Sequence, residues 1–116
     1  MATMEDIDTQ KDAALAILDA KILDARKQRN AGVPPAKEAQ LDQAIEDLAA
    51  QRQAVFDQAF ESALNSDEMN RALAALRTAT ADMSKVAAQM TTATSIIANV
   101  AALGSAVDKV MTALKG

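Results

Sequence analysis

The pattern that decides the fold lies in residues 72–114, which read ALAALRTATADMSKVAAQMTTATSIIANVAALGSAVDKVMTAL. From Ala72 onward, apolar or glycine residues recur at alternating steps of four and three as far as Leu114. This spacing is typical of a long helix that lies against other helices. The seam consists of Ala72, Leu76, Ala79, Met83, Val86, Met90, Ala93, Ile97, Val100, Gly104, Val107, Met111 and Leu114.

Two helices are expected before this seam. Thr3 and Asp6 form a capping pattern, so the first helix is expected over residues 4–30. Gly32 can close it with a left-handed residue, and Pro34-Pro35 should start a second helix over residues 35–64. Such a short connection predicts an antiparallel hairpin.

The third helix is expected over residues 66–115, after a cap at Asn65 or Ser66. The predicted fold class is therefore all-α. An antiparallel helical hairpin precedes a long heptad-patterned helix, arranged as a three-helix bundle or a coiled-coil-like assembly. The 116 residues should form a single helical domain, and a kink at Gly104 remains open.

Composition predicts a thin core. Hydrophobic residues make up 50% of the chain, but alanine dominates them, and Phe56 and Phe60 are the only aromatic residues. The two rings are expected to anchor the packing near the end of the second helix. Because alanine buries little area, the core should supply modest stability, which association with other chains could supplement.

Residue content argues against most kinds of chemistry. The chain has no histidine and no cysteine, which removes the usual bases, thiol nucleophiles and metal ligands. Glu38, Asp42 and Glu46 share one helix face, but such ladders are usually solvated surface. We therefore expect no enzyme activity, no cofactor and no metal site. The net charge of −4 and the shortage of aromatic residues argue against nucleic-acid binding.

The segment between Lys85 and Asp108 contains no charged residue, although residues 1–85 carry fifteen acids and ten bases. A helix of this kind is not expected to stand alone in water. Since the first two helices are too short to cover the third, its end should project. Three outcomes are open: burial against other copies or another protein, insertion of residues 86–107 into a membrane, or a fold-back at Gly104.

The sequence favours a protein–protein interaction or assembly subunit, or an adaptor, that binds its own copies or another helical protein. The residues expected to make this interaction are Val86, Met90, Ile97, Val100, Leu103, Val107 and Met111. One alternative is a membrane-active helical protein that inserts residues 86–107. Another is a small acidic inhibitor or immunity-type protein that binds its partner through residues 1–61. The acidic N-terminus lacks the pattern of a secretory signal, so a cytoplasmic location is the default expectation.

Overall fold

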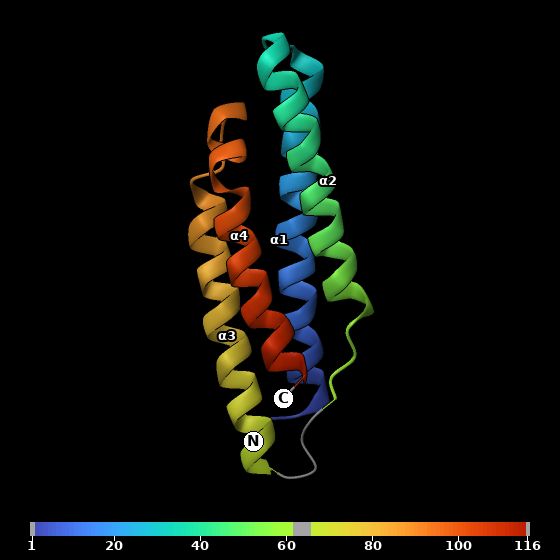
Figure 1. The fold of residues 1–116 in the computed structure, drawn as a ribbon. Helices are drawn as coiled ribbons and strands as arrows, with labels where there is room; N and C mark the ends of the chain where they lie inside the picture. Colours follow the sequence, from blue (N-terminus) through green and yellow to red (C-terminus); the bar gives the residue numbers. More distant parts are fainter. Residues whose placement is uncertain (1, 62–65, 116) are drawn as a thin grey trace.

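The computed structural model describes residues 2–61 and 66–115 and contains four α-helices in that part of the chain (Figure 1). They are α1 (Met4–Ala31), α2 (Pro35–Asp57), α3 (Ser66–Ala88) and α4 (Ala93–Lys115). The prediction of an all-α protein is confirmed. The architecture is a four-helix bundle made of two helical hairpins, α1–α2 and α3–α4.

The two hairpins lie side by side and point the same way (Figure 1). Both chain termini lie at one end of the bundle, and both hairpin turns point toward the other end. α1 and α4 contact each other and each of the remaining helices, whereas α2 and α3 make no contact within the described residues. α2 and α3 therefore occupy diagonally opposite positions in the bundle.

Local signals in the first hairpin act as the sequence predicted. Thr3 accepts a hydrogen bond from the Asp6 backbone, and the Asp6 side chain accepts one from the Thr3 backbone, which completes a capping box. Gly32 ends α1 with a φ of +95°, a conformation that favours glycine. Pro34 is the N-cap of α2, and Pro35 occupies its first position.

The core runs along the inside of all four helices. The fully buried side chains are mainly Leu, Ile, Val and Met, and alanines fill the closer approaches between helices. This alternation of large and small residues lets the four helices pack closely without a fully buried aromatic residue among those described. The largest fully buried side chains are Ile7, Leu18, Leu41, Leu48, Val55, Leu76, Met83, Met90, Ile96, Leu103, Val110 and Leu114.

The prediction of one continuous helix over residues 66–115 is wrong. The chain leaves α3 after Ala88, reverses, and starts α4 at Ala93. The reversal was expected at Gly104 if it occurred at all, but Gly104 lies inside α4. The heptad pattern gives no sign of the turn because Met90, a residue of the turn, is fully buried. Its side chain continues the apolar pattern into the core.

The turn is held by side chains that compete with a continuous helix. Thr92 Oγ1 accepts a hydrogen bond from the Ser95 backbone at 3.2 Å, and Ser95 Oγ accepts one from the Thr92 backbone at 2.8 Å. This is a capping box with serine in the place of the usual Glu or Gln. Lys21 of α1 also donates to the Met90 carbonyl at 3.3 Å. Folding back at this point buries one face of the uncharged segment against the chain's own helices.

The second helix is shorter than predicted, since α2 ends at Asp57 and residues 58–61 are not helical. The rest of the predicted helix, residues 62–64, and the expected cap at Asn65 lie outside the described residues. Two contacts fix the non-helical segment: Lys11 Nζ donates to the Gln58 carbonyl at 2.7 Å, and the Glu61 backbone donates to the Leu114 carbonyl at 2.9 Å.

The two phenylalanines behave differently from each other. Phe60 packs against the core, as predicted. Phe56 remains 53% exposed and does not anchor the packing; the Arg52 guanidinium lies 5.0 Å from the centre of its ring. A cation over an aromatic face is attracted to the ring electrons, which gives this exposed side chain a local partner.

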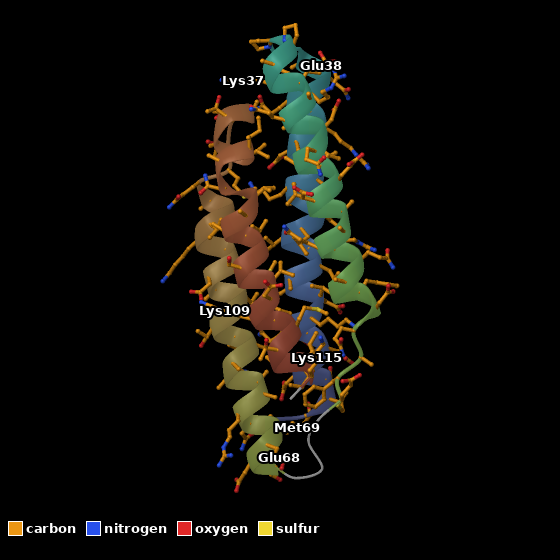
Figure 2. The ribbon with its side chains drawn as sticks, viewed as in Figure 1. Lys37, Glu38, Glu68, Met69, Lys109 and Lys115 are labelled. Atoms are coloured by element: carbon orange, nitrogen blue, oxygen red, sulfur yellow. The ribbon has the colours of Figure 1, made fainter. Side chains whose placement is uncertain are left out.

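The part that projects is also different from the expected one. The end of the long helix was expected to extend beyond the bundle. Instead, the tip of the α1–α2 hairpin extends past the α3–α4 turn (Figure 1). Lys37 and Glu38 lie at this tip in Figure 2, and the Lys37 ammonium group donates to the Thr94 hydroxyl at the start of α4.

Candidate interaction surface

The structure places the seven predicted interaction residues on the inner side of the second hairpin. Met90, Leu103 and Val107 are buried, and the other four pack against the core while partly exposed: Val86, Ile97, Val100 and Met111. The helices that face them belong to the same chain. Whether another protein also binds these residues stays a prediction, and such a partner could reach the three buried ones only if the hairpins separated.

Along α4 the deepest line is not the main seam of the sequence pattern. Ile96, Leu103 and Val110 recur every seven residues and are fully buried. Ile97 and Val100, which belong to the main seam, are only half-buried. The sequence shows this second apolar line beside the main seam, but Ile96 and Val110 were not among the predicted interaction residues.

The acidic face of the first hairpin is partly neutralised by basic residues. Arg29 pairs with Glu38 at 2.7 Å and with Asp42 at 2.9 Å, joining the end of α1 to the start of α2. Two of the three carboxylates in the series Glu38, Asp42 and Glu46 thus already share the Arg29 guanidinium. Within the described residues, no group of three or more acidic side chains is arranged to hold a metal ion.

A groove opens on the outer face of the second hairpin, on the side away from the core. Its volume is about 1090 Å³. Most of its lining is alanine and threonine, and charged residues lie around these small side chains. The lining residues are Glu68, Arg71, Ala72, Ala74, Ala75, Thr78 and Ala79 of α3 with Asp108, Lys109, Thr112 and Ala113 of α4.

One ridge of α3 forms the wall of this groove and continues beyond it. Its residues recur at alternating steps of three and four, which places them on one face of the helix. Five of the six are exposed, and Asp82 is half-buried where it pairs with Lys109 of α4 at 3.1 Å. We call this set the α3 ridge; it consists of Glu68, Arg71, Ala75, Thr78, Asp82 and Lys85.

The α3 ridge was missed in the sequence because only apolar residues were followed. Its spacing is the same heptad spacing as the core seam, displaced by one residue, which places it about 100° around the helix from that seam. A search for repeated spacing among small and charged residues would have found it. In Figure 2, Glu68 lies near the start of α3 and beyond the end of α4 at Lys115, so α4 does not flank this end of the ridge.

Charge differs strongly between the two hairpins. Residues 1–61 carry twelve acidic and seven basic residues, whereas residues 66–116 carry four acidic and five basic residues. The first hairpin of one molecule therefore repels other acidic surfaces, and the second hairpin does not.

α4 also has the length and apolar composition of a membrane-crossing helix. It has 23 residues, and 33% of its most apolar window is buried inside the bundle. Core helices of soluble proteins can meet the same two criteria. Comparisons of the chain with protein families, with curated proteins and with solved structures gave no match.

Proposed function

We propose that this protein is a non-enzymatic assembly subunit or adaptor that binds another helical surface. The observation that supports this proposal best is the groove on the outer face of α3 and α4. Small residues along its walls let the backbone of another helix approach closely, which increases the contact between two helices. The nearly neutral second hairpin removes the electrostatic barrier that the acidic first hairpin would impose.

The proposal differs in one respect from what the sequence pattern favoured. The apolar seam of residues 86–111 packs within the chain, so the external partner is assigned to the opposite side of the same hairpin. Both surfaces use helix-to-helix packing, but the inner one is largely covered by the chain's own helices while the bundle stays closed.

A photo-crosslinking experiment tests this function. Thr112, which is exposed in the groove, is replaced by benzoylphenylalanine, and exposed Ala50 of α2 receives the same residue as the matched control. In cells that make the protein, the Thr112 variant should give a discrete adduct that the Ala50 variant lacks. Adding Ala75→Arg, which fills the groove, should remove that adduct. Equal labelling at both positions, or an adduct that survives Ala75→Arg, would contradict the proposed function.

The composition of α4 supports a second candidate, a membrane-active protein. Opening of the bundle would release a 23-residue helix whose length matches the hydrocarbon thickness of a bilayer. Flotation with liposomes tests this candidate. Protein that rises with the lipid would support it, and protein that stays in the dense fraction while remaining folded would rule it out.

A further inference from the structure

The charges on the α3 ridge are complementary to those of a second α3 ridge that runs antiparallel to it. In order, the ridge carries an acid at Glu68, a base at Arg71, two small residues, an acid at Asp82 and a base at Lys85. Reversing this order places each acid opposite a base. The centre of this pattern falls between Leu76 and Arg77.

We propose that a second copy of this chain packs antiparallel against the α3 ridge, with the twofold axis passing between Leu76 and Arg77. The inference rests on the proposed function and names the partner for the same surface. In this arrangement Ala75 faces Thr78 of the second copy at the centre of the seam. Arg71 faces Asp82, and Glu68 faces Lys85, on both sides of that centre.

The spacing fits the geometry of an antiparallel coiled coil. Steps of three and four generate two alternating core positions, and in an antiparallel pair each position packs against the other type in the partner. The three pairs named above obey this rule. The ridge spans about 27 Å at 1.5 Å per residue, which is two and a half heptads.

Side chains beside the ridge permit the close approach that this seam needs. Ala74, Ala81 and Ala88 recur at seven-residue steps next to the ridge, and all three are exposed. With alanine at these positions the two α3 helices can lie at the short end of the usual 8–10 Å between helix axes. The α4 wall then also contacts the second copy.

Electrostatics favour this register over others. Arg71 and Lys85 form no ion pair with any residue that the structure describes. In the pair, Arg71 of the second copy comes level with Asp82, which also pairs with Lys109 of its own chain, and Asp108 adds a second carboxylate to the groove. A parallel pairing would instead place Arg71 against Arg71 and Asp82 against Asp82, which is repulsive.

The first test measures association of the purified full chain by sedimentation equilibrium over a wide concentration range. We expect a monomer–dimer equilibrium. Arg71→Glu replaces two attractive contacts by two repulsive ones, and we expect the dimer to become about tenfold weaker. Arg77→Glu makes the same charge change on the α1 side of the helix and should leave the equilibrium unchanged. A wild-type chain that stays monomeric, or equal effects of the two changes, would overturn the inference.

The second test mixes two variants that each form a weakened dimer alone. Arg71→Glu and Asp82→Lys each place like charges at two contacts in their own dimers. When the two are mixed, the introduced glutamate of one copy faces the introduced lysine of the other, and the native contact between Asp82 and Arg71 remains on the opposite side. Recovery of near-native affinity in the mixture is expected, and no recovery would exclude this register.

The absence of cysteine from the chain permits a direct test of geometry. A mixture of Arg71→Cys and Asp82→Cys chains should form a disulfide between unlike chains on mild oxidation, because the paired Cα atoms come within disulfide reach. Arg71→Cys alone should not, since its two copies would lie about 17 Å apart along the seam. Disulfides between like chains would contradict the antiparallel arrangement.

The proposed function and this inference can fail separately. If the Thr112 crosslink described above joins two copies of this chain, both are supported. If it joins this chain only to a different protein, the second-copy inference is overturned while the proposed function stands. If Thr112 gives no groove-dependent adduct, the proposed function is overturned as well.

Discussion

The side-chain amide of Gln51 in α2 lies over Gly104 in α4. Gln51 Nε2 is 3.0 Å from the position that a Cβ atom on Gly104 would occupy, and it donates a hydrogen bond to the Val100 carbonyl at 3.3 Å. A polar side chain thus fills the space that glycine leaves between two parallel helices. A larger residue at position 104 would displace this amide.

Substitutions at Gly104 should therefore depend on size. Gly104→Ala should be close to neutral, since a gain in helix propensity of up to about 1 kcal/mol is offset by the shift of Gln51. Gly104→Leu should lower the free energy of unfolding by about 1–3 kcal/mol through overpacking. Urea denaturation measures both. Ala101→Leu, at an exposed position of the same helix, is the control and should change little.

Gln51 itself should be replaceable with a gain in stability. Its Oε1 atom is buried and has no hydrogen-bond partner among the described residues. Gln51→Met keeps the shape of the side chain and removes the buried carbonyl oxygen. We expect stabilisation by about 1 kcal/mol, or a rise in Tm of roughly 4 °C. A fall in Tm would show that the hydrogen bond to Val100 outweighs the unsatisfied oxygen.

The α3–α4 turn should depend on its capping box. Thr92→Ala removes the oxygen that accepts from the Ser95 backbone, which should cost about 1 kcal/mol. Hydrogen exchange at Ser95 should accelerate in this variant. Thr112→Ala makes the same change inside α4, where the hydroxyl bonds only to the Asp108 carbonyl, and should be neutral. Equal losses in the two variants would contradict a specific role for the cap.

Lys21 should stabilise the bundle through the end of α3. Its ammonium group donates to the Met90 carbonyl and pairs with Asp24, and its side chain is only 15% exposed. Lys21→Met keeps the apolar stem and removes the donor, so the free energy of unfolding should fall by about 1 kcal/mol. The exposed Lys27→Met is the matched control. If both variants unfold at the same urea concentration, the hydrogen bond from Lys21 to the Met90 carbonyl contributes nothing measurable to stability.

Leucine-to-alanine substitutions at a buried and at an exposed position should differ in the stability that they cost. Leu48 is fully buried between helices, and Leu48→Ala should cost about 2–5 kcal/mol. Leu23 is 53% exposed near the end of α1, and Leu23→Ala should change stability by less than about 0.5 kcal/mol. Thermal unfolding followed by circular dichroism measures both. A large loss at Leu23 would indicate that the hairpin tip is covered in solution by another molecule.

Local signals in the sequence were sufficient for the turn of the first hairpin and for the start of each of its helices, but not for the end of α2. Thr3, Gly32 and Pro35 act within a few residues of their own positions, so their roles could be predicted without knowing the rest of the structure. The apolar seam also identified Leu76 and Met83 as core residues correctly.

The turn at residues 89–92 could not be predicted from periodicity. A turn whose central side chain, Met90, stays in the core preserves the apolar pattern on both sides of it. The only local signal was Thr92 with Ser95, and serine is a weaker partner than glutamate in a capping box. The preference for folding back arises from long-range burial against α1 and α2, which a pattern within one segment does not contain.

The same limit of periodicity explains why the predicted interaction residues lie largely inside the bundle. Periodicity identifies which residues share a helix face but not which chain covers that face. For Leu103 and Val107 the covering helices are internal. The α3 ridge emerged only when the structure showed which side of α3 remains uncovered.

Because α2 and α3 lie diagonally opposite each other, they do not pack together when the chain folds. Each hairpin is made of consecutive residues, so its contacts close short loops at a small entropic cost. Docking of the two hairpins requires contacts between distant parts of the sequence, such as those of Lys11, Lys21 and Gln51 with residues far along the chain. We therefore expect the two helical hairpins to form early and their docking to be the slower, rate-limiting step. Two chains present together during that last step can exchange hairpins, and a slower dilution during refolding should increase the yield of such exchanged pairs.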